Sequence, residues 1–262
     1  MFNLHESRND AQQRFYEVYS TLRKRICLLE YEPGKRLSEH ALAEEFNISR
    51  TPIRRVLTTL ENEGMVEIRH GAGNYVSTVE LDYLCDIYAM RMELVMLIPQ
   101  KLKSPMPDSV LQQMQQLLIK SQQINQNQSP QHAFAEINLE LFEITLQAID
   151  SRALCEMLSL LFYKSARMWP FLLKDNRLLK KETDILSEEI TDLTRVLQAG
   201  HHNSIATILR FHIECALYRL QQYCLAQNPS TAATAKAATA TAATVKTTTK
   251  TKASAPKTAI KQ

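Results

Sequence analysis

Arginine and hydroxyl side chains are concentrated in residues 49–55. Such side chains donate hydrogen bonds, and an arginine can bind a planar group that carries two hydrogen-bond acceptors. A guanidinium carries a fixed fork of N–H donors that can bind a guanine edge bidentately, and a hydroxyl can reach a phosphate oxygen. Base edges and phosphates occur together in DNA, so the segment indicates a DNA-reading surface. Its candidate contact residues are Ser49, Arg50, Thr51, Arg54 and Arg55.

These side chains need a rigid support, and the flanking residues predict a helix-turn-helix. Ser38 suits the N-cap of a short helix, and Asn47 suits the turn that follows it. Ser49 is the next expected N-cap. Pro52 falls in the first turn of the following helix, where its missing N–H costs nothing because that donor has no intrahelical partner. The second helix is therefore expected to start at Arg50.

The apolar spacing of this second helix predicts which side faces outward. Ile53, Val56, Leu57 and Leu60 form an inward stripe at helical spacing. The arginines and Thr51 are then left on or near the outward N-terminal surface, where a recognition helix meets base edges. The helix N-terminus adds partial positive charge toward a phosphate.

A support helix and a hairpin are expected on either side. Apolar spacing predicts a helix over residues 9–29. Gly64 suits the position just after the recognition helix, and residues 65–69 and 74–79 alternate like the strands of a wing. The tip of this wing offers Arg69, His70 and Gly71 to a DNA backbone or minor groove.

The remaining chain is almost purely helical in pattern, so the expected fold class is mainly α. An N-terminal winged helix-turn-helix domain (1–79) is followed by an all-helical bundle (80–228) of about six helices. The tail (229–262) is rich in Ala, Thr and Lys, and it is expected to be disordered because it has little apolar surface to bury. The expected bundle helices cover residues 80–98, 108–126, 132–149, 151–174, 178–198 and 203–226.

The amino-acid composition indicates a globular protein but does not show whether the protein binds nucleic acid. The 262 residues are 45% hydrophobic, which is enough for two cores. No run approaches the roughly 20 apolar residues of a membrane helix, and no signal-peptide pattern begins the chain, so a cytoplasmic location without a membrane partner is expected. The net charge is +3 and the tail alone holds six lysines, so only local charge is informative. Those lysines indicate a solubilising tail or, alternatively, sequence-independent attraction to phosphates.

The five cysteines are widely spaced and form no CxxC pair. They are expected to be buried small apolar residues in a reducing compartment. Redox sensing by Cys215 and Cys224 is the alternative. The full set is Cys27, Cys85, Cys155, Cys215 and Cys224.

The helix-turn-helix and the wing carry one combined motif in residues 42–43, 48–54, 57, 60–61, 63–66, 71 and 73–76. It resembles the winged helix of GntR-family bacterial transcription regulators over residues 10–79. The resemblance implies DNA contact from Ser49, Arg50, Arg54 and the wing at His70 and Gly71, with a supporting contact near His40. Relatives usually have an acid followed by alanine at Arg55 and Val56, and often arginine at His40, so this chain's operator is expected to differ.

The helical part resembles the FCD-type effector domain of the FadR-like branch of this family, with a helix count closer to its VanR-type members. The resemblance implies a small organic effector, with carboxylates among the candidates. A homodimer is expected because one recognition helix makes few base contacts and a two-fold axis doubles them. Residues 87–91 are similar to the first effector-domain helix, whose arginine often faces a carboxylate ligand. The bundle interior is the expected site, with Arg91, Glu143 and His212 as candidates; alternatively each pairs internally or faces water.

Many such relatives hold a divalent metal through an Asp-x-x-x-His pair and two later histidines. The corresponding positions here are Leu139, Glu143, Ile190 and His212, of which only His212 is preserved. No metal and no other cofactor are therefore expected. The alternative is a substitute site formed by Glu143, Glu188 or Glu189 with His212.

The expected function is a dimeric, sequence-specific DNA-binding transcription regulator that reads a near-palindromic double-stranded operator. An enzyme housed in the helical domain is one alternative, although the chain lacks nucleophile–base spacing, a phosphate loop and an intact metal motif. A protein-interaction module that retains a winged helix as scaffold is the other.

Overall fold

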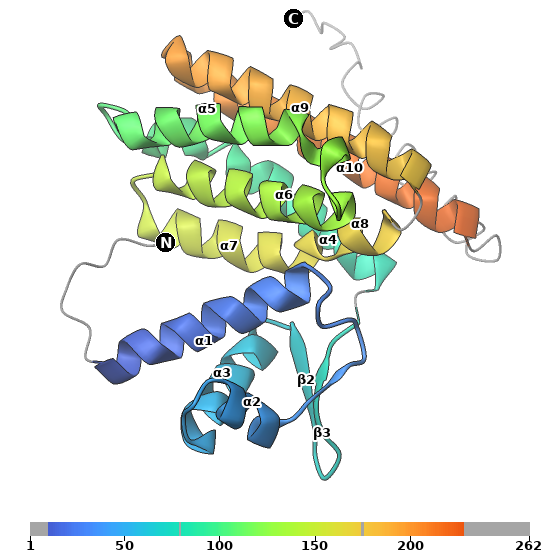
Figure 1. Ribbon diagram of the computed structural model, residues 1–262. Helices are drawn as coiled ribbons and strands as arrows, with labels where there is room; N and C mark the ends of the chain where they lie inside the picture. Colours follow the sequence, from blue (N-terminus) through green and yellow to red (C-terminus); the bar gives the residue numbers. More distant parts are fainter. Residues whose placement is uncertain (1–9, 79, 174–175, 228–262) are drawn as a thin grey trace, which may run out of the picture. The chain divides into compact units, whose positions relative to one another are not determined.

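The computed structural model describes residues 10–78, 80–173 and 176–227 (Figure 1). The chain divides into two compact units, one ending at Leu217 and the other beginning at Tyr218. The tail expected at residues 229–262 lies outside the described residues, and the expected domain boundary at residue 79 stays a prediction. None of the described helices is both long and apolar enough to span a membrane.

The N-terminal part of the chain folds as the predicted winged helix-turn-helix. Its hairpin is confirmed, and a short strand ahead of the second helix joins it in an antiparallel sheet of order β1-β3-β2. The sequence pattern does not predict β1, because two residues are too few to show a period. The elements are α1 (Asp10–Cys27), β1 (Arg36–Leu37), α2 (Glu39–Glu45), α3 (Arg50–Asn62), β2 (Val66–Arg69) and β3 (Gly73–Val76).

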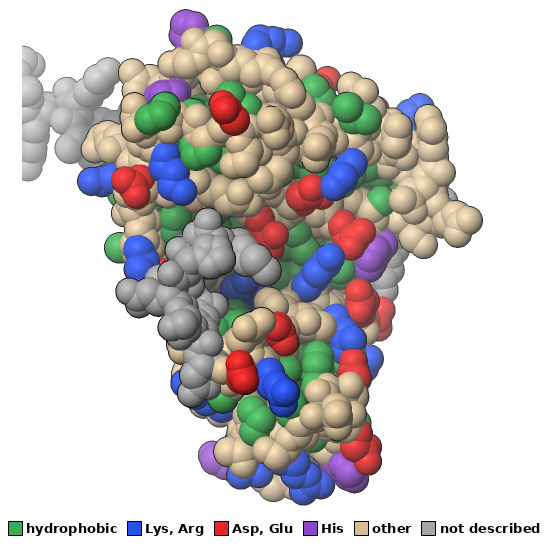
Figure 2. Space-filling view, turned by 60° about the vertical axis from the view of Figure 1, so that its left-hand side comes forward, with side chains coloured by type: hydrophobic (Ala, Val, Ile, Leu, Met, Phe, Trp, Pro, Cys, Tyr) green, Lys and Arg blue, Asp and Glu red, His purple; other side chains and the backbone are tan. Residues whose placement is uncertain are grey.

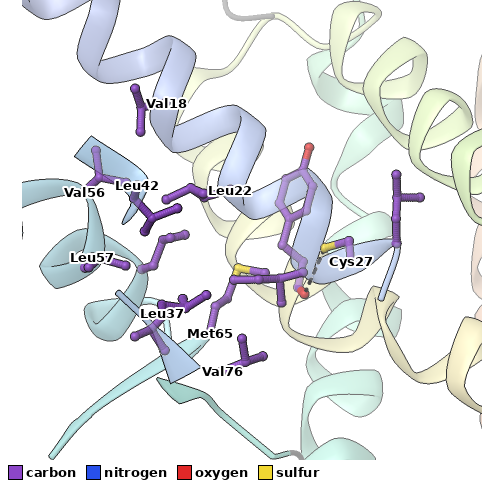
Figure 3. Packing of buried hydrophobic residues seen from close by; sticks show 14 of the residues in the cluster. Val18, Leu22, Cys27, Leu37, Leu42, Val56, Leu57, Met65 and Val76 are labelled. Atoms are coloured by element: carbon purple, nitrogen blue, oxygen red, sulfur yellow. Dashed lines mark hydrogen bonds between the residues drawn. The ribbon is translucent and has the colours of Figure 1, made fainter. Parts of the chain in front are cut away.

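The core of the winged helix fixes the rotation of α3 about its own axis. Leu22 and Ile26 of α1 and Leu57 and Leu60 of α3 are each 0% exposed. Val76 of the wing belongs to the same cluster (Figure 3). Full burial of such a side chain is worth about 1.5–3 kcal/mol relative to exposure. Any rotation of α3 would expose part of this stripe, so its opposite face is held toward solvent.

The two helices of the helix-turn-helix are capped differently. The Ser38 hydroxyl accepts a hydrogen bond from the Ala41 N–H at 3.3 Å. Ser49 occupies the predicted N-cap position of α3, but its side chain makes no capping bond. The Ser49 hydroxyl therefore does not bond the first N–H groups of α3.

Ser38→Ala is expected to destabilise the fold more than Ser49→Ala. Loss of a capping side chain costs about 0.5–2 kcal/mol of unfolding free energy, and only Ser38 makes that bond. Urea denaturation of the two variants at equal protein concentration measures the difference. Equal losses of unfolding free energy would contradict this assignment of the caps.

The described chain after the wing is helical, as predicted. The expected block at 151–174 is divided, because Pro170 lacks the N–H that would bond the Ala166 carbonyl and its ring crowds that turn. One helix thus ends at Ala166 and the next begins at Met168. The elements are α4 (Leu81–Val95), η1 (Ile98–Lys101), α5 (Asp108–Gln122), η2 (Ile124–Gln126), α6 (Pro130–Gln147), α7 (Arg152–Ala166), α8 (Met168–Leu172), α9 (Asn176–Gln198) and α10 (His202–Gln227).

Helix α7 contacts both the bundle and the winged helix. α4 packs along α7, α5 packs on α6 and α9, and α1 also contacts α7 (Figure 1). The guanidinium carbon of Arg23 on α1 lies 3.7 Å from the centroid of the Tyr163 ring on α7. A cation over an aromatic ring at this distance is attractive, so α1 is joined to α7 by more than apolar contact.

The described cysteines form no disulfides with one another and differ in exposure. Cys27 and Cys155 are buried, as expected, whereas Cys85, Cys215 and Cys224 are half-buried. Burial raises the pKa of Cys27 to about 12. Its thiol is therefore protonated at neutral pH and acts as a small apolar group in the cluster of Figure 3.

Candidate DNA interface

The turn between α2 and α3 determines where the recognition helix begins. Asn47 has a φ of 51°, in the left-handed region that asparagine tolerates better than most residues. The Ile48 N–H donates to the Ala43 carbonyl at 3.0 Å, which closes the turn. The predicted turn at Asn47 is confirmed, and it delivers Ser49 to the N-terminus of α3.

α3 has one buried stripe and one exposed basic face. The stripe is the predicted one, namely Ile53, Val56, Leu57 and Leu60. Figure 2 shows Lys, Arg and His side chains on the winged-helix part of the molecule, with acidic side chains among them. The five predicted contact positions are therefore accessible to a large ligand. These exposed residues are Ser49, Arg50, Thr51, Arg54 and Arg55.

Arg54 is paired with a carboxylate from α2. Its Nε donates to Glu39 Oε1 at 3.2 Å, and its Nη2 donates to Glu39 Oε2 at 2.9 Å. The hydrogen bonds from Arg54 hold the pKa of Glu39 below its usual value, and a hydrogen bond from the Asn74 side chain adds to this effect. The Arg54 side chain is still 69% exposed, against 23% for Glu39. Glu39 was not singled out in the sequence; its one signal is an acid in a helical first turn.

His40, Ser49 and Arg50 meet at an open hollow of about 440 Å³ beside the helix-turn-helix. Ser49 supplies a hydroxyl, Arg50 a guanidinium, and the start of α3 supplies N–H groups without intrahelical partners. Such a donor set suits a phosphate oxygen. His40 Nε2 also lies 3.6 Å from Glu44 Oε1, on the same helix.

Arg55 lies on a different side of α3 from Arg50 and Arg54. Positions 50 and 54 are one turn apart and share a face. The Arg55 guanidinium carbon instead lies 4.9 Å from the centroid of the Phe15 ring on α1. The structure thus separates Arg55 from the other two arginines. Its contact with DNA stays a prediction, and the position beside α1 suits a backbone phosphate better than a base.

The wing presents a cation, an imidazole and a glycine at its tip. Arg69, His70 and Gly71 are exposed. Arg69 Nη2 donates to Glu67 Oε2 at 3.0 Å, and its guanidinium carbon lies 4.6 Å from the centroid of the Tyr75 ring. Gly71 has a φ of 75° and no atom within 4 Å of a would-be Cβ, so its conformation rather than crowding favours glycine.

Arg36 is a further exposed cation beside the wing that the sequence pattern did not single out. The β1–β3 pairing sets it opposite Tyr75. A Cβ added to Gly73 would lie 3.2 Å from Arg36 Nε, so the arginine side chain lies across that glycine. A lone arginine before a helix cap is a weak sequence signal, and only the pairing of β1 places it near the wing.

The three effector candidates do not form one group. Arg91 on α4 donates from Nη1 to Ser165 Oγ on α7 at 3.1 Å. Glu143 on α6 is exposed and accepts a hydrogen bond from the Tyr163 hydroxyl at 3.3 Å. Glu143 therefore lies at the Tyr163 side of α7, apart from the Arg91 contact.

Glu189 of α9 lies beside His212, and its charge also acts on Arg91. His212 Nδ1 lies 3.8 Å from Glu189 Oε2, and their side chains are 11% and 19% exposed. Burial lowers the pKa of Arg91, while the negative charges around it, among them that of Glu189, act in the opposite direction. His212 and Glu189 are thus neighbours, whereas Arg91 is related to Glu189 only through the charge of that carboxylate.

Two of the positions where relatives carry metal ligands hold hydrocarbon side chains. Leu139 is 6% exposed and Ile190 is 0% exposed. In the described ranges, no group of three or more His, Cys, Asp or Glu side chains is arranged to hold one ion. The substitute set of Glu143, Glu188 or Glu189 with His212 is therefore not gathered. The absence of a metal cofactor stays a prediction.

A capped helix-turn-helix with an exposed arginine face and a basic wing defines the winged-helix class of DNA-binding domains. Residues 16–76 match the family described as bacterial regulatory proteins, gntR family. The winged-helix segment is therefore of the gntR type.

The chain also aligns with a named regulator. It is 42% identical over 72 residues to the Uxu operon transcriptional regulator of Escherichia coli (strain K12), which is 27% of this chain and 28% of that protein. The chain spans about a third of the length of the first curated relatives it matches. These two alignments, of 75 and 72 residues, are too short to span both the winged helix and the helical domain.

Solved structures extend the similarity of fold to most of the chain. A GntR transcriptional regulator from Rhodococcus sp. RHA1 has a TM-score of 0.64 at 15% identity and covers 80% of this chain and 98% of its own. The E. coli protein McbR/YncC has a TM-score of 0.61 at 22% identity, with coverages of 80% and 97%. The helical part therefore shares its fold with those proteins.

Proposed function

We propose that this protein is a transcription regulator that binds double-stranded DNA sequence-specifically. The observation that carries the proposal is the exposed face at the start of α3, where Arg50 and Arg54 stand beside Ser49 in a segment that matches the gntR family. Arginine discriminates guanine by bidentate contact, and the Ser49 hydroxyl and helix start suit a phosphate. The remaining proposed contacts are His40, Thr51, Arg55, Arg69, His70 and Gly71.

The proposed active form is a homodimer on a near-palindromic operator. One recognition helix reaches few base pairs, whereas two copies related by a two-fold axis read two half-sites about one helical turn apart. An isologous dimer therefore doubles the base contacts without new residues. Because a bacterial operator lies in the cytoplasm, so does the proposed site of action.

Control by a small organic effector, with carboxylates among the candidates, is also part of the proposal. Arg91 and His212 of the bundle offer two basic side chains to an anion. Arg91 of α4 contacts Ser165 of α7, and Arg23 of α1 lies over the Tyr163 ring of the same helix, so α7 touches both the bundle and the winged helix. An effector would change DNA affinity only if it bound one arrangement of the winged helix and the bundle more tightly than another.

The proposal includes no catalysis and no resident metal. The matched relatives are named as regulators, and the side chains of Leu139 and Ile190 cannot coordinate an ion. Regulation of this kind needs only that the affinity for DNA depends on the DNA sequence and on whether the helical bundle holds an effector.

Selection of genomic fragments that the purified full-length chain retains tests the proposal. The affinity for a selected duplex is then compared with that for a scrambled duplex of equal length and composition at physiological salt. The selected duplex is expected to bind at least about 1,000-fold more tightly, as specific sites typically do. Equal affinity for both duplexes would overturn the proposal, whatever the retained fragments are.

A further inference from the structure

One acidic side chain stands directly behind the arginines of α3. Glu39 belongs to the first turn of α2 and accepts two hydrogen bonds from Arg54. The positive charge of Arg50 also contributes to lowering its pKa. A carboxylate at this position repels DNA phosphates, so it weakens sequence-independent binding to DNA.

The carboxylate is held in place from the wing. Asn74 donates a side-chain hydrogen bond to Glu39 and is itself only 7% exposed. It lies in the central strand β3, paired with Leu37 on one side and Ile68 on the other. The two neighbouring strands leave Asn74 little freedom, so Glu39 is fixed at the junction of α2, α3 and the sheet.

The bonds to Glu39 use one particular edge of the Arg54 guanidinium. The Nε and Nη2 hydrogens on that edge are directed at the two carboxylate oxygens. Three of the five N–H donors remain, on Nη1 and on the outer side of Nη2. This second edge again offers two parallel donors, which is the arrangement that matches N7 and O6 of guanine.

We propose that Glu39 is a positioning residue that makes Arg54 a reader of bases and weakens its attraction to phosphates. This inference rests on the proposed DNA-binding function. The Glu39–Arg54 pair has no net charge, so Arg54 gains little from a phosphate at an arbitrary site. Its orientation is meanwhile fixed in advance, so little side-chain entropy is lost when its outer edge meets a guanine.

The test compares Glu39→Ala and Glu39→Gln with the unchanged chain on three duplexes across a salt series. The duplexes are a selected operator, the same operator with the guanine read by Arg54 replaced, and a scrambled sequence. Glu39→Ala is expected to reduce discrimination between the first two about ten-fold, in the lower half of the range of about 5- to 150-fold for one bidentate contact. Affinity for scrambled DNA is expected to rise, and its salt slope to steepen by about 0.9 as Arg54 turns to a phosphate.

Glu39→Gln separates positioning from folding. The amide keeps the side-chain shape and one acceptor oxygen but loses the charge, so an intermediate loss of discrimination is expected at an unchanged unfolding midpoint. A purely structural role of Glu39 would lower affinity for all three duplexes and leave the salt slope unchanged. That result would overturn the inference.

Glu45→Ala is the matched control. It also removes an acid from α2, but the ion pair of Glu45 among the described residues is with Arg25 of α1, at 2.5 Å, and not with an arginine of α3. Discrimination at the guanine is expected to stay unchanged in this variant. In the Arg54→Ala background, Glu39→Ala is expected to have no further effect on discrimination.

The measurements distinguish a failure of the role assigned to Glu39 from a failure of the proposed DNA-binding function. If the unchanged chain prefers the selected operator while Glu39→Ala discriminates equally well, only the role of Glu39 is wrong. If the unchanged chain shows no preference for any duplex, the proposed function itself fails.

Discussion

Arg50→Ala and Arg54→Ala are each expected to weaken binding to a selected operator by about 5- to 150-fold per contacted guanine. That range corresponds to the roughly 1–3 kcal/mol of discrimination that one bidentate arginine–guanine pair supplies. Both side chains are exposed at the start of α3, where a recognition helix meets base edges. In a dimer the loss occurs in both half-sites, so the double variant is expected to bind the operator no better than scrambled DNA.

Fluorescence anisotropy with labelled duplexes at fixed salt measures both affinities. Arg152→Ala is the matched control, because Arg152 is also an exposed helical arginine in an ion pair, at 2.8 Å from Glu156 on α7. It is expected to leave operator affinity unchanged. If Arg50→Ala and Arg54→Ala behave like Arg152→Ala, the assignment of reading residues is wrong.

Leu57→Ala is expected to lower the free energy of unfolding by about 2–5 kcal/mol. Leu57 is 0% exposed and packs in the cluster that holds α3 against α1. The substitution leaves a cavity that the neighbouring side chains fill only in part. Specific DNA binding is expected to be lost with the fold, since the rotation of α3 depends on this stripe.

Chemical denaturation at one fixed protein concentration measures the loss, because association changes apparent stability. Ile119→Ala provides the comparison: Ile119 lies on α5 and is 59% exposed. A surface substitution of this kind is expected to stay within about 0.5 kcal/mol. Similar losses in the two variants would show that the cluster does not stabilise the winged helix.

The recognition helix was predictable because every signal for it is local. The capping serine, the proline in the first turn and the three-and-four spacing all lie within residues 49–60. The structure confirms the start at Arg50 and the buried stripe. Gly64, expected just after this helix, has a φ of 70° and follows the C-cap residue Glu63.

The pairing of Glu39 with Arg54 was not predictable from the same signals. The two residues are separated by 15 positions, and neither carries a motif that points to the other. Their contact depends on the angle between α2 and α3, which the turn at Asn47 and the packing below it determine. The same holds for Arg36, whose place beside Gly73 follows from strand pairing alone.

The helical domain shows where sequence periodicity stops being informative. Its helices were expected close to where they occur, except that Pro170 divides the block at 151–174. Arg91, Glu143 and His212 were expected to line one effector site. In the structure Arg91 contacts Ser165, Glu143 contacts Tyr163 and His212 lies beside Glu189, and their role in binding an effector stays a prediction. Periodicity gives the apolar face of each helix but not the neighbour against which that face packs.

By itself the sequence determined the winged helix-turn-helix, the arginines on its exposed face and the helical character of the chain that follows, because caps, turns and apolar stripes are encoded within a few turns of chain. The tertiary structure alone decided that Glu39 holds one edge of Arg54, that Arg55 lies beside α1, and that Glu189 lies beside His212. Each of these contacts joins separate elements. Their geometry depends on how whole elements pack together, and no local pattern of residues records it.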